Sequence, residues 1–226
     1  MVVSPHADDA ELGCGGYMHQ VSKAGGVVVN VVVAVGDMHF AHLGRTVSSQ
    51  ERQDELNASM TRLGCRWQLI FSDLDGRLDT VPLAHLVSHL DALIGAFRPH
   101  EVLIPLPSSH QDHEVVYRAC IAACRPSRIA GQVHLIAAYE YPATSWGAGS
   151  AADASRGGMY AEIGDGDLEA KLEALRCHHS QIRNGGHCWS LEAAQAMAAM
   201  RGIEAGVRYA ELFHVMREVR RCQEAA

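Results

Sequence analysis

Short β-branched runs alternate with amphipathic segments along most of the chain. The runs that predict strands are Val2–Val3, Val27–Val35, Trp67–Phe71, Val102–Pro105 and Val133–Tyr139. The segments between them have helical spacing and lie near Leu12–Ala24, Gln50–Leu63, Leu83–Phe97 and His113–Cys124. Strands that alternate with helices predict right-handed βαβ units. We therefore expect one α/β domain over residues 1–226, in which helices cover both faces of a mostly parallel sheet.

Local signals support these boundaries. Ser48 with Glu51 three residues later predicts a capping box at the start of a helix, and Gly64 predicts its C-cap. The stretch 141–158 is rich in Gly, Ser and Ala and has no period, so we expect a surface loop that acts as a lid over a site. After it, "DLEAKLEALRCHH" and "LEAAQAMAAMR" predict helices, and "AELFHVM" predicts a final strand.

Composition narrows the function classes. The chain has 226 residues and a formal net charge of −7, which argues against a nucleic-acid surface. Its longest apolar run, "VVVNVVVAV", is too short to span a membrane, and no secretory leader opens the sequence, so we expect a cytoplasmic protein. The 7 cysteines form no Cys-x-x-Cys pair, and we expect them to be reduced and packed as small apolar groups.

The loop after the first predicted strand reads "PHADDAELGCGG" and allows two interpretations. As a dinucleotide-binding turn, its glycines would cradle phosphates and Asp37 would hold a ribose. The pattern fits poorly, because Met18 stands where the third glycine should be and the acidic residues would repel a pyrophosphate. As a metal site, His6 and Asp9 would turn to one side of the loop and an ion would offset the crowded negative charge.

A second cluster of the same chemistry strengthens the metal interpretation. "PLPSSHQDHEVV" follows the strand Val102–Pro105, and its His110 and His113 are three residues apart, on one face of a first helical turn. Ligands bind at the carboxyl ends of strands in open α/β sheets, where both clusters lie. Two histidines and one carboxylate with a remaining water position are typical of catalytic zinc.

The two motifs together resemble the LmbE/PIG-L family of metal-dependent N-deacetylases, whose motifs are Pro-His-x-Asp-Asp and His-x-Asp-His. "RQDELNASMTRLG", "YEYPATSW", "KLEALRCHHSQ" and "RYAELF" are similar to further segments of that family, so the resemblance covers nearly the whole chain. It implies a Rossmann-like α/β fold that binds zinc instead of a dinucleotide. His6, Asp9 and His113 align with the family's metal ligands, for which Zn²⁺ is expected and Fe²⁺ is also suitable.

The resemblance also implies catalytic roles. Asp8 aligns with the general base, and His110 with the histidine that stabilises the oxyanion or protonates the leaving amine. Asp112 aligns with a partner that orients a histidine. The departures are Ala7 and Gln111, where proline is frequent, and Ser108, where some relatives carry a tyrosine.

For the substrate, the resemblance implies a small N-acetylated amino sugar, and because relatives are often oligomeric it allows a homo-oligomer. The net charge and the short apolar runs predict no nucleic-acid or membrane partner. We expect Arg52, His39 and His178 to bind the sugar, with a structural role as the alternative for each. Trp146 and Tyr141 could stack on a sugar or pack within their loop. Three other functions stay open: an amidase acting on a thiol conjugate or an acylated natural product, a metal-holding binding module, and dinucleotide binding.

Overall fold

The centre of the molecule is a seven-stranded sheet with the strand order β5-β2-β1-β6-β7-β9-β8. The computed structural model describes residues 1–128, 132–142 and 158–220. The strands are β1 (Val2–Ser4), β2 (Val29–Ala34), β5 (Arg66–Phe71), β6 (Glu101–Pro105), β7 (Leu135–Tyr139), β8 (Gly158–Glu162) and β9 (Ala210–Glu218). The first five in this order are parallel. Strand β9 is antiparallel to both β7 and β8.

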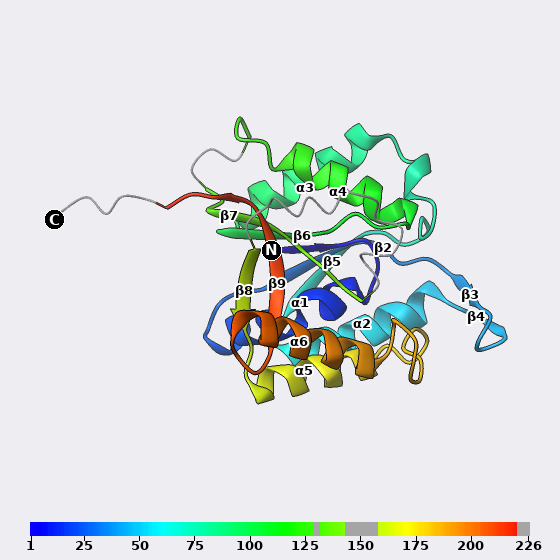
Figure 1. The fold of residues 1–226 in the computed structure, drawn as a ribbon. Coiled ribbons are helices and arrows are strands. Elements are labelled where there is room, and N and C mark those ends of the chain that lie inside the picture. Colours follow the sequence, from blue (N-terminus) through cyan, green and yellow to red (C-terminus); the bar gives the residue numbers. More distant parts are fainter. Residues whose placement is uncertain (129–131, 143–157, 221–226) are drawn as a thin grey trace.

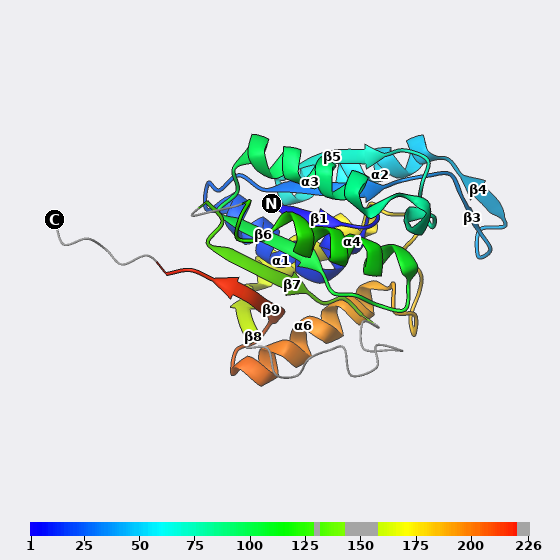
Figure 2. The same cartoon turned by 90° about the horizontal axis from the view of Figure 1, so that it is seen from above.

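Helices cover both faces of the sheet, as the sequence predicts (Figures 1 and 2). One face carries α3 (Leu83–Phe97) and α4 (Gln111–Ala123). The other carries α1 (Asp9–Lys23), α2 (Ser49–Leu63), α5 (Asp165–Arg176) and α6 (Leu191–Ala205). The expected single α/β domain with a mostly parallel sheet is therefore confirmed. No helix within the described ranges has the length and apolar character needed to cross a bilayer.

The core has two halves, one on each side of the sheet. Val32 on β2 packs with Leu12 and Leu56 of the α1 and α2 side. Its neighbours Val31 and Val33 pack into the half that α3 and α4 cover. Successive side chains of a strand point to opposite faces, so a continuous apolar run can serve both halves.

The structure adds elements that the sequence pattern did not indicate. Strand β8 is a short edge strand with alternating exposure, and β3 (Met38–Phe40) pairs with β4 (Arg45–Val47) in a hairpin that projects from the body of the molecule (Figure 1). Strands of three residues are too short to show a hydrophobic period. Most of the proposed lid at 141–158, including Trp146, lies outside the described residues.

The N-cap and the C-cap of α2 are confirmed, but the predicted capping box forms only in its Ser48 half. Ser48 Oγ accepts a hydrogen bond from the Glu51 N–H at 3.1 Å, and Gly64 ends the helix with φ +66. The carboxylate of Glu51 pairs with Arg45 on β4 instead of returning to the cap. The N-terminus of α2 is therefore tied to the projecting hairpin.

Helix α1 starts close against the sheet and is kinked. A Cβ on Gly13 would lie 2.2 Å from the Tyr139 ring, so only glycine allows this approach. At the kink, Cys14 leaves helical geometry with φ −141. Beyond it, the N–H groups of Gly16 and Tyr17 donate to the carboxylate of Glu211 on β9 at 3.0 and 2.8 Å. Glu211 is buried and also accepts from Lys171 Nζ of α5 at 2.7 Å.

Candidate active site

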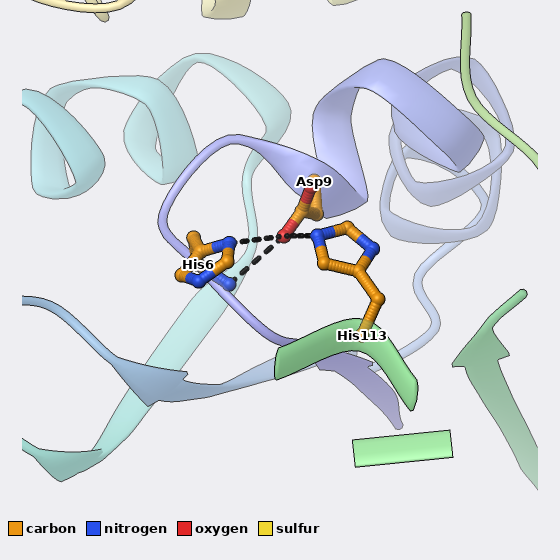
Figure 3. Close-up of side chains that lie close together, drawn as sticks. All are labelled: His6, Asp9 and His113. Atoms are coloured by element: carbon orange, nitrogen blue, oxygen red, sulfur yellow. Dashed lines mark hydrogen bonds and ion pairs between the residues drawn. The ribbon is translucent and has the colours of Figure 1, made fainter. Parts of the chain in front are cut away.

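Three predicted ligands meet at the carboxyl edge of the sheet. Asp9 Oδ2 lies 3.3 Å from His6 Nδ1 and 3.5 Å from His113 Nε2 (Figure 3). The His6 backbone N–H also donates to Asp9 Oδ2, at 2.9 Å. One donor atom from each of the three residues lies within 4.8 Å of the others. His113 is about a hundred positions from His6 and Asp9 in the sequence, and the fold brings it to them.

Their meeting follows from the topology. His6 lies in the loop after β1, Asp9 is the first residue of α1, and His113 is in the first turn of α4, after β6. Strands β1 and β6 are parallel neighbours, with Val2 opposite Leu103. Their carboxyl ends therefore open into one space.

The donor set fits a divalent metal ion. Burial lowers the pKa of His113 to about 4, so its imidazole is neutral, which is the form that binds metal. Burial alone would raise the pKa of Asp9, but His113 and His6 outweigh it and lower that pKa. Burial opposes charge on His6, yet hydrogen bonds with Asp112 and Asp9 raise its pKa well above the ordinary value. The pocket thus favours positive charge where an ion would be held.

Asp112 orients His6. Its Oδ2 lies 3.0 Å from His6 Nε2, and its two oxygens accept from the backbone N–H groups of Gly76 at 2.7 Å and Leu78 at 2.9 Å. This places the proton of the His6 ring on Nε2 and leaves Nδ1 for an ion. His6, His110 and Asp112 form a second group able to hold metal. A neutral imidazole has one acceptor nitrogen, so the two groups cannot use His6 at once.

Tyr141 gives His113 a similar partner that sequence reasoning did not assign. The Tyr141 hydroxyl lies 2.7 Å from His113 Nδ1. If Nε2 faces the ion, Nδ1 carries the proton and donates to the tyrosine oxygen. Both residues are buried, so this contact is shielded from water.

Replacing Tyr141 with phenylalanine is expected to weaken metal affinity about 10- to 100-fold, because the His113 ring loses the partner that fixes its orientation. Competition with a chromogenic chelator measures this directly. Tyr160→Phe is the matched control, since its exposed hydroxyl contacts Glu204 on the outer surface. Equal affinities for Tyr141→Phe and wild type would contradict the assignment.

Asp8 and His110 stand beside the three ligands. Asp8 is only 5% exposed and precedes α1, yet its carboxylate makes no capping hydrogen bond with that helix. Burial, with repulsion from Asp9, raises the pKa of Asp8 to about 6. His110 caps α4, where its Nδ1 accepts from the Asp112 N–H at 3.2 Å, and its ring centre lies 4.9 Å from that of His6. Burial, followed by His6, lowers the pKa of His110.

These residues line a cavity of about 810 Å³, within the range of sites for small molecules. Its floor carries His6, Asp8, Asp9, Asp75, His110 and His113. Its walls come from the β3–β4 hairpin, the loop before α4, Tyr141 and Pro142, and the segment between α5 and α6. The walls are largely apolar and aromatic, as in most small-molecule sites.

The three residues expected to bind substrate lie in different environments. His39 is exposed on the hairpin and lines the cavity. Arg52 is 1% exposed and pairs with Asp75 Oδ2 at 2.5 Å. His178 is fully buried, with Nε2 2.8 Å from Glu11 Oε1. The described contacts of Arg52 and His178 are thus with the protein itself, and their binding roles stay predictions.

Sequence reasoning did not single out Asp75. Its side chain is 2% exposed, and Oδ1 lies 3.6 Å from His6 Nε2. It follows β5, the outer parallel strand, whose carboxyl end reaches the same edge as β1. The sequence could have indicated Asp75 only as an acidic residue that follows a parallel strand, because no recognisable motif surrounds it.

Comparison with known proteins agrees with this geometry. Residues 1–124 match the family described as PIG-L: GlcNAc-PI de-N-acetylase. A protein of Escherichia coli K12 described as the uncharacterized deacetylase YaiS is 28% identical over 150 residues, which cover 64% of this chain and 74% of YaiS. N,N'-diacetylchitobiose deacetylase from Pyrococcus horikoshii, solved with an inhibitor, has a TM-score of 0.72 at 23% identity over 95% of this chain and 82% of its own.

The same fold also serves other chemistry. GalB from Pseudomonas putida KT2440, a 4-carboxy-2-hydroxymuconate hydratase, has a TM-score of 0.70 at 18% identity over 100% of this chain and 98% of its own. Fold alone therefore does not decide the reaction. The family match covers more than half of the sequence and includes both the His6 to Asp9 loop and the His110 to His113 turn. The chain belongs to the PIG-L family of deacetylases.

Proposed function

We propose that this protein is a zinc-dependent hydrolase that removes an acetyl group from the nitrogen of an amino sugar or an amino-sugar derivative. The observation that carries the proposal is the convergence of His6, Asp9 and His113 beside Asp8, whose carboxylate is not needed for helix capping. A protein that only binds a metal ion needs the metal-ligating residues but no residues that transfer protons. Asp8 and His110 add groups that move protons, on the floor of a cavity large enough for a sugar.

A divalent ion held by His6, Asp9 and His113 would supply Lewis-acid activation of a water molecule and of the amide carbonyl. Asp8 accepts the proton of the attacking water. Its raised pKa makes its carboxylate a stronger base than an exposed aspartate. Two imidazoles and one carboxylate suit Fe²⁺ as well as Zn²⁺, so the ligands alone do not select the metal. The choice of zinc is therefore part of our proposal.

His110 acts on the other side of the reaction. Its Nδ1 is held by the Asp112 N–H, which leaves Nε2 to face the reacting group. A donor at this position stabilises the negative charge that develops on the carbonyl oxygen. His110 or the protonated Asp8 then supplies the proton that the leaving amine requires.

Release of free amine tests the function. Purified protein supplied with Zn²⁺ is expected to liberate glucosamine or its derivatives from N-acetylglucosamine compounds, detected with an amine-reactive dye. An N-acylated thiol conjugate and an acylated natural product lacking a sugar serve as comparison substrates. Turnover of those compounds, with none of the amino sugars, would replace the proposed substrate class while keeping the amidase chemistry.

A further inference from the structure

The segment between α5 and α6 carries a cation that the mechanism above does not use. Arg183 lines the same cavity as His6 and Asp8, together with Trp189. Its backbone N–H donates to the Trp189 carbonyl at 2.8 Å, which closes the segment into a loop, and Gly186 turns the chain with φ +79. This guanidinium therefore sits on a fixed loop at the cavity wall.

Within the described ranges, Arg183 forms no ion pair with a carboxylate. Its Nη1 contacts His187 Nε2 at 2.8 Å, and its Nε is buried without a hydrogen-bond partner. Nδ1 of the same His187 ring lies 3.1 Å from the Trp189 N–H. A neutral imidazole accepts at one nitrogen only, so His187 cannot serve both donors.

Arg52 differs from Arg183, because its charge is balanced by a carboxylate of the same protein. Arg52 is buried, pairs with Asp75 at 2.5 Å and donates to the Gly36 carbonyl at 2.8 Å. A partly buried guanidinium with no negative partner loses hydration without full compensation. At Arg183 the guanidinium lies 5.7 Å from the centre of the Trp189 ring, which gives attraction but neutralises no charge.

We propose that Arg183 binds an anionic group of the substrate, a phosphate or a carboxylate, and so makes the enzyme selective for acidic amino-sugar derivatives. This inference rests on the proposed deacetylase function. The fork of an arginine matches both anions through paired hydrogen bonds. The volume of about 810 Å³ leaves room for a charged substituent beside the acetylated sugar.

Three substrates and two variants test the inference. N-acetylglucosamine 1-phosphate carries a phosphate, N-acetylmuramic acid carries a carboxylate, and methyl N-acetylglucosaminide is neutral. In Arg183→Gln, KM for the preferred acidic substrate is expected to rise about 10-fold or more, with the neutral substrate changed less than about 2-fold. Arg183→Lys keeps the charge and is expected to restore part of the loss.

The control variant is Arg62→Gln, which removes an arginine that is 61% exposed on α2 and does not line the cavity. It is expected to leave all three KM values unchanged. If Arg183→Gln harms neutral and acidic substrates equally, Arg183 only holds its loop and the inference is wrong. A wild-type enzyme with no preference for either acidic substrate would also overturn it.

A binding measurement separates this inference from the deacetylase proposal. Calorimetry with glucosamine 1-phosphate and with muramic acid requires no turnover. Binding of either compound to wild type, weakened at least about 10-fold in Arg183→Gln, supports the anion site even if no substrate is hydrolysed. Equal binding, or no binding, by both proteins contradicts it.

Discussion

Replacing Asp8 with asparagine is expected to lower turnover by about 100-fold or more while the protein keeps its metal. Asparagine has nearly the same shape as aspartate but cannot accept a proton from water, and general bases typically contribute 10²- to 10⁴-fold. The carboxylate of Asp8 is buried on the cavity floor and does not cap α1, so the substitution should leave the helix intact. Steady-state kinetics with measurement of metal content by atomic absorption checks both statements.

Asp79→Asn is the matched control, because Asp79 is exposed and its side chain does not line the cavity. It should behave as wild type. If Asp8→Asn retained full turnover with metal bound, another group would have to accept the proton. If it lost the metal, Asp8 would be a ligand and its role in the scheme would change.

Removal of the metal is expected to reduce activity to background, and added Zn²⁺ or Fe²⁺ is expected to restore it. The ion would be held by only two imidazoles and one carboxylate, and without it neither water nor the amide carbonyl is activated. Dialysis against a strong chelator, followed by titration with each metal, measures the loss and the recovery. Circular dichroism before and after dialysis confirms that the fold survives.

The substitution His113→Ala is a second way to obtain protein that is depleted of metal. Loss of a ligand from α4 should lower metal affinity, and excess metal should recover only part of the activity. His100→Ala is a useful comparison, since His100 lies just before β6, at the opposite end of that strand. Activity that persists after exhaustive chelation would remove metal from the proposed mechanism.

The sequence predicted the parallel part of the fold well because each buried strand is an apolar run and each helix has a clear period. It also predicted the meeting of His6, Asp9 and His113, since all three follow strands that end at one edge. The starts of helices were less accurate. Helix α1 begins at Asp9, before the apolar residues that indicate it, because polar residues can occupy a first helical turn.

Other parts of the site depend on contacts that leave no local pattern. Tyr141 reaches His113 from the end of β7, and Asp75 reaches His6 from the loop after β5. Arg52 was expected at the substrate, but the structure shows it paired with Asp75, a partner 23 residues away. Which charged groups neutralise one another is set by tertiary packing, and a single sequence does not reveal it.

The kink in α1 links the catalytic loop to the far end of the chain. Two amide groups in the middle of that helix depend on Glu211, and Glu211 in turn depends on the ammonium of Lys171. A fragment ending at residue 124 would contain every residue of the two motifs but would leave those amides without their acceptor. Residues from the last third of the chain therefore hold the middle of α1 in place, and the catalytic unit extends beyond its two sequence motifs.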